Sequence, residues 1–237
     1  MRVALAVASK EVQTYFTSPM GYIVALVFVA LTGYFFVASI STDFPEASID
    51  GYITPSALIL IFLAPAMTMR LFAEEQKLGT LELLLTSPVR DWEVVLGKFA
   101  SSLVFFLATL GLTLLYVLLL GFYGNPDWGP VWSGYLGLAL YGGAALSIGL
   151  LTSSFTNNQI IALVVGFGIL LILFVIDQAA SLVSGTASTV LSQIGLTGHL
   201  EDFTRGVVDT RNIVYYLTVM AVFLFLTVRS VESRRWR

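Results

Sequence analysis

The stretch Leu71–Lys98 reads LFAEEQKLGTLELLLTSPVRDWEVVLGK and is the longest charged run in an otherwise apolar chain. It lies between two long hydrophobic segments, so we expect it at a membrane surface. Gly79 interrupts its first half, Pro88 ends that half, and Asp91 has the residue type and place of an N-cap. Leucines recur there at helical spacing and predict one apolar face: Leu71, Leu78, Leu81 and Leu85. The stretch therefore predicts a short, bent, amphipathic helical element between two spans.

The composition is that of an integral membrane protein. Of 237 residues, 57% are hydrophobic and 11% are charged, and the mean hydropathy is +0.88, whereas soluble domains carry about 25% charged residues. Because a span takes about 20 residues, six helices and their connections use the whole length. We therefore predict a single transmembrane domain over residues 1–237. Cysteine is absent, which excludes disulfides, thiolate metal sites and cysteine nucleophiles.

Hydrophobic segments without charged residues in their cores predict an all-α fold of six transmembrane helices. They lie at about 20–40, 53–69, 99–122, 131–151, 160–176 and 213–228. Pro65 falls inside the second span, where it removes a backbone hydrogen bond and bends the helix. Asp177 marks the expected end of the fifth span. In the fourth span small residues recur every four positions and predict the close approach of another helix: Ala139, Gly143 and Ser147.

Segments outside the spans carry further expectations. Residues 1–18 predict an interfacial helix along the cytoplasmic surface. Its expected apolar face is made of Leu5, Ala8, Val12, Tyr15 and Phe16. Residues 178–211 hold short apolar pieces broken by glycines, and they predict one or two helices that dip partway into the membrane before the last span. The tail from Arg229 to Arg237 is expected to lie against anionic lipid.

The distribution of Lys and Arg predicts the orientation. The chain has 12 such residues, and the predicted topology places ten on one side and two on the other, Arg205 and Arg211. The richer side holds Arg2, Lys10, Arg70, Lys77, Arg90, Lys98, Arg229, Arg234, Arg235 and Arg237. Since positive residues concentrate on the cytoplasmic side, both termini and the stretch Leu71–Lys98 are predicted to be cytoplasmic.

A family resemblance comes from one ordered set of residues: Glu75, Gly79, Thr80, Leu81, Glu82, Leu84, Leu85, Ser87, Pro88, Gly97 and Lys98. This set resembles the signature of ABC-2 type transporter permeases, particularly the small GldF/NosY-like branch. The resemblance is close over Leu71–Lys98, and the number and placement of the spans fit the rest. It implies a coupling helix after the second span that docks on a separate ATPase. It also implies an interfacial helix before the first span and re-entrant helices before the sixth.

The resemblance further implies roles for individual residues. We expect coupling to the ATPase to involve Glu74, Glu75, Gly79, Thr80, Leu81, Glu82, Leu85 and Pro88. Of these, Glu75 and Glu82 are expected to face the ATPase or to pair with nearby bases. The chain contains no GxxxxGK[ST] loop. ATP and Mg are therefore expected on the partner ATPase, and this chain is expected to have no cofactor and no catalytic residue.

Further partners follow from the number of spans. Six spans are half of the usual twelve in this family, so a second copy or a paralogous permease would complete the pathway. An auxiliary periplasmic subunit and membrane lipid are further expected partners, and no nucleic acid is expected. The chain would then be the permease subunit of an ATP-driven exporter in a bacterial inner membrane. The branch suggests gliding-motility or cell-envelope export, and the sequence does not choose a substrate.

Other function classes are weighed against this one. The span cores lack the ionisable residues that proton-coupled transporters use. A passive channel or a structural membrane subunit stays open as an alternative. An intramembrane serine protease is a remote alternative, because the single histidine, His199, falls in the external segment and Ser147 lacks the usual glycine two residues before it. His199 with Glu201 and Asp202 could suggest a metal site, but no other residue supports one, and no metal is expected.

Overall fold

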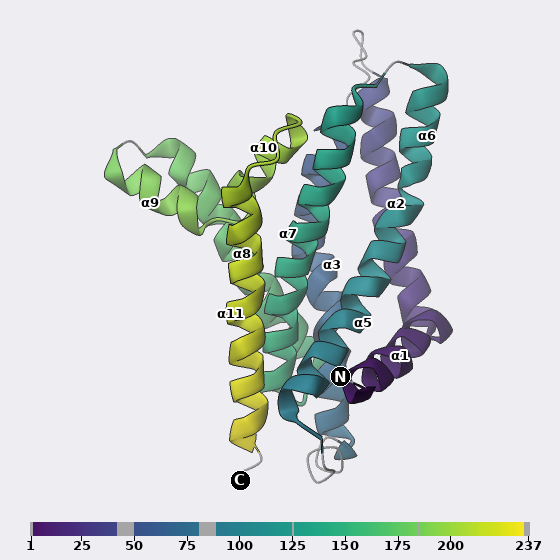
Figure 1. Cartoon of the computed structure of the whole chain (residues 1–237), viewed down its shortest axis with the longest axis vertical. Coiled ribbons are helices and arrows are strands. Elements are labelled where there is room, and N and C mark those ends of the chain that lie inside the picture. Colours follow the sequence, from purple (N-terminus) through teal and green to yellow (C-terminus); the bar gives the residue numbers. More distant parts are fainter. Residues whose placement is uncertain (1, 42–49, 81–88, 125, 184, 235–237) are drawn as a thin grey trace.

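The computed structural model describes residues 2–41, 50–80, 89–124, 126–183 and 185–234. Every regular element in these ranges is a helix (Figure 1). In chain order they are α1 (Arg2–Thr17), α2 (Pro19–Ile40), α3 (Asp50–Lys77), α5 (Asp91–Leu112), α6 (Leu114–Tyr123), α7 (Trp128–Phe155), α8 (Gln159–Leu182), α9 (Thr186–Ile194), the 3-10 turn η1 (Gly198–Leu200), α10 (Glu201–Thr204) and α11 (Thr210–Arg234).

Within the described ranges, six helical segments are long and apolar enough to cross a membrane. They are α2, α3, α5 with α6, α7, α8 and α11. This confirms the predicted all-α integral membrane fold. Each predicted span lies inside one of these segments, and the helices extend beyond the spans because their polar ends find partners within the protein.

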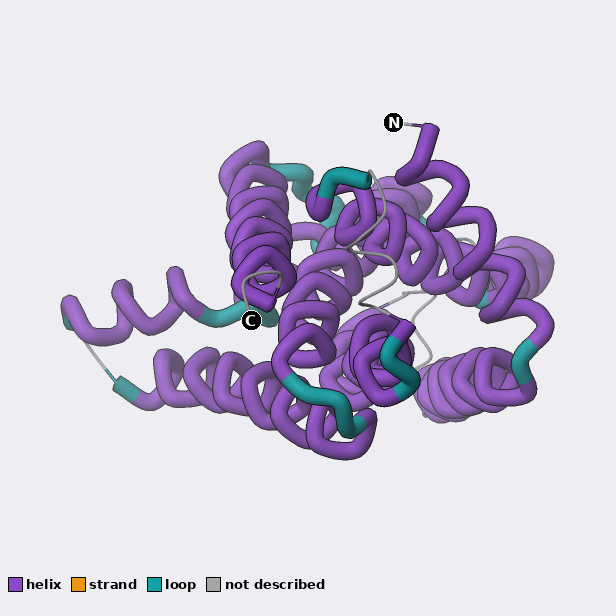
Figure 2. Tube along the Cα trace, turned by 90° about the horizontal axis from the view of Figure 1, so that it is seen from below, coloured by secondary structure: helices purple, strands orange, loops and turns teal. Residues whose placement is uncertain are grey.

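Helix α7 is the centre of the bundle. It packs against α3, α8 and α11, and nearly all of its length from Val131 to Ser154 is buried. Its sequence is rich in glycine, alanine and serine, which lets neighbouring helices come close. Seen from below, the helices gather around this core, and the hairpin of α8 and α9 extends to one side (Figure 2).

Helix α2 is attached to the bundle along one stripe. Its buried residues are Gly21, Val24, Phe28, Thr32 and Phe36, mostly four positions apart. The rest of its surface is apolar and exposed, as suits a helix that faces acyl chains. Ser18 begins the helix as its N-cap, and the Ser18 hydroxyl accepts the Met20 N–H at 3.3 Å.

A chain of buried hydroxyl groups joins three helices near the junction of α5 and α6. The Tyr52 hydroxyl of α3 donates to the Tyr135 hydroxyl of α7 at 2.9 Å, and the Thr113 hydroxyl lies 2.9 Å from the same oxygen. Thr113 also donates to the carbonyl of Leu110 at 2.6 Å. Since buried polar groups are costly without partners, this network fixes how α3, α5 and α7 pack there.

Helix α3 runs past the predicted second span of 53–69 to Lys77, because no helix breaker intervenes before Gly79. Two predicted positions were wrong. Helix α8 does not end at Asp177 but continues to Leu182. The N-cap of α5 is Arg90, and Asp91 is its first helical residue, where a carboxylate favours the positive end of the helix dipole.

Candidate functional site

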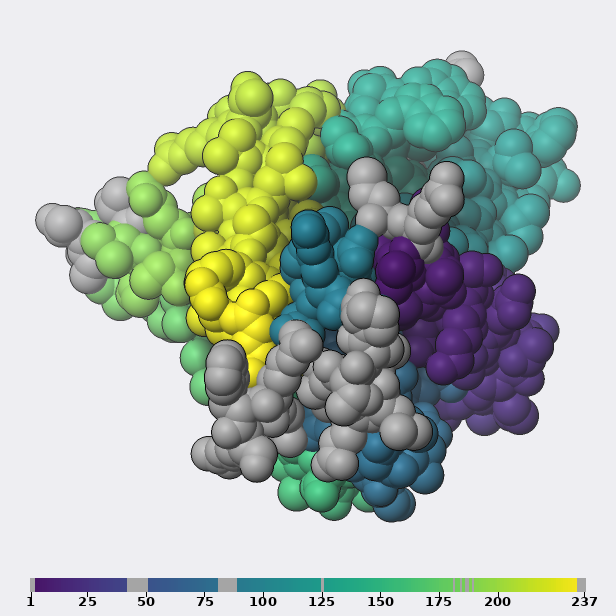
Figure 3. Space-filling model, turned by 60° about the horizontal axis from the view of Figure 1, so that its bottom comes forward, coloured from purple at the N-terminus to yellow at the C-terminus, as the bar shows by residue number. Residues whose placement is uncertain are grey.

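The end of α3 and the start of α5 flank the segment that the sequence analysis singled out. Both ends lie in the lower part of the molecule, together with α1 and the C-terminal end of α11 (Figure 1). When the bottom is turned forward, the start of α5 lies between α1 and the C-terminal part of α11 (Figure 3). We refer to residues 71–80 and 89–98 as the two arms of the candidate site.

The arm from α3 is anchored in the bundle rather than lying free at an interface. Leu71, Phe72 and Ala73 are buried. The Ser153 hydroxyl of α7 accepts the N–H groups of Phe72 and Ala73, both at 3.1 Å. The Gln76 amide donates to the carbonyl of Ser154 at 2.9 Å, so the end of α7 gains a partner for one of its last carbonyls. These contacts explain why α3 is longer than its hydrophobic run.

The predicted coupling residues of this arm fall into two groups. Glu74, Gly79 and Thr80 are exposed, whereas Glu75 is half-buried. Gly79 has a φ of +70°, which favours glycine, and its N–H donates to the carbonyl of Gln76 at 3.3 Å, so it ends α3. The Thr80 hydroxyl donates to the carbonyl of Glu75 at 3.3 Å. The remaining predicted residues lie outside the described residues: Leu81, Glu82, Leu85 and Pro88.

The predicted leucine face is changed by the end of α3. Leu71 is buried inside the bundle, but Leu78 follows the helix end and is 66% exposed. The two leucines therefore do not share one face of a continuous helix. The proposed apolar face of Leu81 and Leu85 stays a prediction, since both lie outside the described residues.

A buried lysine joins both arms to α1. Lys98 of α5 is 1% exposed. Its Nζ lies 2.8 Å from Oε1 of Glu11 in α1 and 2.8 Å from Oε1 of Glu75 in α3. The ammonium also lies 5.3 Å from the centre of the Phe72 ring. We call Glu11, Lys98 and Glu75 the lysine triad. Within the described part of the chain, the second carboxylate oxygen of Glu75 is buried without a hydrogen-bond partner.

Sequence reasoning missed the role of this lysine. In the sequence, Lys98 was interpreted only as a charge that sets topology and as the last residue of the family signature. A signal was nevertheless present, because Glu11 is the single carboxylate of α1 and Gly97 precedes the lysine. A Cβ at Gly97 would lie 2.7 Å from the carbonyl oxygen of Ala4 and 2.9 Å from Cβ of Val7. Glycine at position 97 therefore lets the backbone of α1 approach α5.

Helix α1 packs on the bundle by a face that overlaps the predicted one: Ala8, Val12 and Tyr15 are partly or fully buried, as predicted. Its least exposed positions include Ala4, Val7, Glu11 and Tyr15, which share one helical face. Leu5, predicted to be on the apolar face, is 71% exposed, and Phe16 is also exposed. The packed face therefore also includes Ala4, Val7 and Glu11 and excludes Leu5 and Phe16, because Glu11 pairs with the buried Lys98.

A second attachment holds the C-terminal end of α1 to α3. The Tyr15 hydroxyl donates to the carbonyl of Met67 at 2.6 Å. The Arg70 guanidinium lies 4.4 Å from the centre of the Tyr15 ring and donates to the Ser18 hydroxyl at 3.1 Å. Burial raises the pKa of Tyr15 above its ordinary value, so the phenol stays protonated and remains a donor. Helix α1 is therefore fixed at both of its ends.

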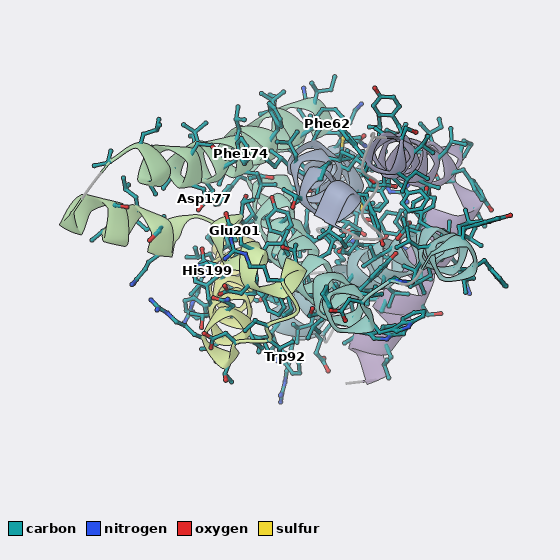
Figure 4. The ribbon with its side chains drawn as sticks, turned by 90° about the horizontal axis from the view of Figure 1, so that it is seen from above. Phe62, Trp92, Phe174, Asp177, His199 and Glu201 are labelled. Atoms are coloured by element: carbon teal, nitrogen blue, oxygen red, sulfur yellow. The ribbon has the colours of Figure 1, made fainter. Side chains whose placement is uncertain are left out.

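The other end of the molecule holds a polar cavity of about 610 Å³. It lies between the α8–α9 hairpin and the segment from η1 to the start of α11, where Asp177, His199 and Glu201 gather (Figure 4). Asp177 accepts the Thr197 N–H at 2.7 Å. His199 Nδ1 lies 3.0 Å from Oδ1 of Asn212. These groups hold the polypeptide segments around the cavity together.

The surroundings of His199 and of Ser147 are relevant to the two alternatives of a metal site and an intramembrane serine protease. Asp202 accepts the amide of Asn212 at 2.7 Å, and Glu201 pairs with Arg205 at 3.4 Å. Over the described ranges, no group of three His, Cys, Asp or Glu side chains could hold a metal ion. The Ser147 hydroxyl is buried in α7 and donates to the carbonyl of Ala144 at 2.7 Å, so its hydrogen bond is local to that helix.

The predicted packing positions of the fourth span lie in α7. Ser147 is fully buried, and Ala139 packs partly buried against the core. A Cβ at Gly143 would lie 3.0 Å from Sδ of Met220 in α11. Helix α11 therefore passes close to this part of α7, and a larger side chain at position 143 would displace Met220.

Comparison with known proteins identifies the family. The family model described as "ABC-2 family transporter protein" matches residues 37–234. The chain is also similar to the "Probable multidrug ABC transporter permease YbhR" of Escherichia coli strains K12 and O157:H7, at 28% identity over 172 residues in each case. The matched region is 68% of this chain but 44% of each relative, so the chain spans less than half of the relatives' length. Because the family match covers most of the residues described above, the chain belongs to the ABC-2 family of transporter proteins.

Proposed function

We propose that the chain is the membrane permease subunit of an ATP-driven exporter, with ATP and Mg bound by a separate ABC ATPase. Family membership supports the transport role. The sequence has no phosphate-binding loop of its own, so the energy must come from a partner. The observation that carries the proposal is the anchoring of both arms. The end of α3 and the start of α5 are held rigidly by Ser153, Gln76 and the lysine triad.

Anchored arms suit the transmission of force. A connection that only set topology would not need its flanking turns buried and ion-paired. Residues 81–88 join the two arms, so a protein that binds this connection could move α3 and α5 together. Such a partner could contact the exposed residues of the first arm: Glu74, Lys77, Leu78, Gly79 and Thr80. Leu81, Glu82, Leu85 and Pro88 complete the proposed contact.

The orientation belongs to the same proposal. The arms and α1 lie at the end of the molecule that the positive-inside rule assigns to the cytoplasm, where ATP is present (Figure 1). The proposed location is a bacterial inner membrane with both termini cytoplasmic. Two permease chains, identical or similar, would enclose the pathway, because six crossing segments are half of the proposed twelve.

The finer assignment to the GldF/NosY-like branch, with gliding-motility or cell-envelope export, also stays a proposal. The relatives' printed name speaks of multidrug transport, which favours export of organic compounds by this chain as well. An auxiliary periplasmic subunit could bind near the polar cavity at the opposite end. A passive channel or structural subunit is the competing function, and it requires no ATPase.

Site-specific crosslinking tests the proposal, because the chain has no cysteine of its own. Thr80→Cys places a photo-crosslinker on the exposed end of the first arm. Tyr123→Cys, exposed at the end of α6, is the matched control at the opposite end. We expect an ABC ATPase to be crosslinked in native membranes from position 80 and not from position 123. Equal labelling from both positions, or no nucleotide-binding protein from position 80, would contradict the proposed function.

A further inference from the structure

Resting on the proposed function, we propose that α1 is a moving part of the coupling machinery and that Lys98 is the positioning residue that ties it to both arms. The lysine triad puts one ammonium between a carboxylate of α1 and a carboxylate of α3. Helix α5 supplies the ammonium, so three helices meet at one atom. The movement of either arm is then passed to α1.

The ion pairs of the lysine triad favour one relative arrangement of α1, α3 and α5. An ion pair in a poorly hydrated site interacts more strongly than one in water, and it depends strongly on geometry. Lys98 is buried and donates to the Glu11 carboxylate at 2.8 Å, the distance of a charge-assisted hydrogen bond, and its Nζ lies 2.8 Å from Oε1 of Glu75. Withdrawing α1 or α3 from Lys98 would leave a partly buried carboxylate without its cation. The three helices therefore move together rather than slide past one another.

Steric contact supports the electrostatic link. The backbone of α1 lies directly on α5 at Gly97, with no side chain of α5 between them. At the other end of α1, Tyr15 and Arg70 join it to α3. Helix α1 therefore contacts both α3 and α5. These are the two helices that flank the connection that the ATPase is proposed to bind.

From α1 the movement has a short path to α2. Ser18 is the single residue between the two helices. Its hydroxyl accepts hydrogen bonds from Arg70 of α3 and from the N–H of Met20 in α2. Helix α2 is held to the bundle along one stripe only. When α1 is displaced, α2 can follow it with little loss of packing contacts. Moving the central α7 would break many more of these contacts.

Distance measurements between spin labels test this inference in the complex with its ATPase. Tyr34→Cys on α2 and Trp132→Cys on α7 are exposed positions for the labels. In the otherwise unchanged chain we expect Mg-ATP with vanadate to change the distance between them. In the variant Glu11→Met, which cuts the link between α1 and Lys98, we expect that change to be lost while the ATPase stays bound. Lys98 keeps Glu75 as its counter-ion in this variant, so no buried charge is left unpaired.

Two further variants separate positioning from stability. Lys98→Arg keeps a cation that can pair with both carboxylates and should keep the nucleotide-dependent change. Arg229→Gln with Glu232→Gln removes an exposed ion pair of α11 and should also keep it. If Glu11→Met responds to nucleotide as the unchanged chain does, the inference fails although the proposed function stands. If the unchanged chain binds no ATPase, the proposed function fails first.

Discussion

Nζ of Lys98 lies 2.8 Å from Oε1 of Glu75, so a single ion pair joins the two helices that flank the connection between α3 and α5. The Lys98 side chain is 1% exposed, whereas the Glu75 side chain is 19% exposed. The lysine therefore has little access to water as an alternative partner. Substitution of Lys98 should therefore lower the free energy of unfolding more than substitution of a surface lysine.

We expect Lys98→Met alone to lower the free energy of unfolding by about 3 kcal/mol, because it leaves two partly buried carboxylates without a cation. Thermal unfolding in a mild detergent measures this. The matched control is Arg229→Met, which breaks an exposed pair with Glu232 and should cost less than about 1 kcal/mol. Equal losses for the two variants would show that the triad is no stronger than a surface pair.

Gly97→Ala should weaken the contact between α1 and α5. The new Cβ would crowd the carbonyl of Ala4 and the side chain of Val7, and overpacking of this kind costs about 1–3 kcal/mol. Gly111→Ala is the control on the same helix, since a Cβ there meets nothing within 4 Å. That control should gain about 0.5–1 kcal/mol from helix propensity. Unfolding curves that shift in the same direction for both variants would rule out the close approach.

Gly79→Ala should destabilise the end of α3. The φ of +70° costs an L-residue about 1–2 kcal/mol, and asparagine tolerates this conformation better than alanine. Gly79→Asn should therefore lie between glycine and alanine in melting temperature. Gly168→Ala in α8, where φ is ordinary and a Cβ meets nothing within 4 Å, should not destabilise. An alanine at position 79 that melts like the unchanged chain would contradict this account of the helix end.

Asp177→Ala should loosen the segment that joins α9 to α10. The Asp177 carboxylate accepts the partly buried N–H of Thr197 at 2.7 Å, and the substitution would leave that donor without its partner. Hydrogen exchange of residues 195–200 should become about tenfold faster or more. Asp177→Asn keeps an acceptor oxygen and should have a smaller effect.

The control for this exchange experiment is Asp127→Ala, which removes a different helix cap. Its carboxylate accepts the Gly129 N–H at 3.0 Å at the start of α7. Exchange should then quicken around position 129 and stay unchanged at residues 195–200. If Asp127→Ala mobilises residues 195–200 as much as Asp177→Ala does, general destabilisation rather than the local acceptor explains the result.

The six crossing segments could be predicted because hydrophobic length is a local property of the sequence. The end of α3 could not, because its polar residues are satisfied by distant partners. Gln76 bonds to Ser154, 78 residues away, and Lys98 pairs with Glu11, 87 residues away. Viewed locally, Glu74 to Lys77 resembles a water-exposed connection. Only the three-dimensional pairing shows that these residues continue a packed helix.

Asp177 illustrates the same difficulty at the opposite end. A carboxylate after an apolar run was interpreted as the membrane boundary, but α8 continues beyond it. The Thr197 N–H of a later loop donates to this carboxylate and offsets part of the cost of burying it. For the candidate site, Glu74, Gly79 and Thr80 occupy the end of the first arm as its sequence indicated, whereas their contact with an ATPase stays a prediction.

The single packed stripe of α2 has a consequence for handling the protein. Most of the circumference of this helix has no protein neighbour among the described residues, so acyl chains complete its packing. Lipid thickness and fluidity thus act on α2 directly, whereas α7 is shielded from them. The detergent or lipid that is chosen to extract the protein will therefore influence how α2 packs against the bundle.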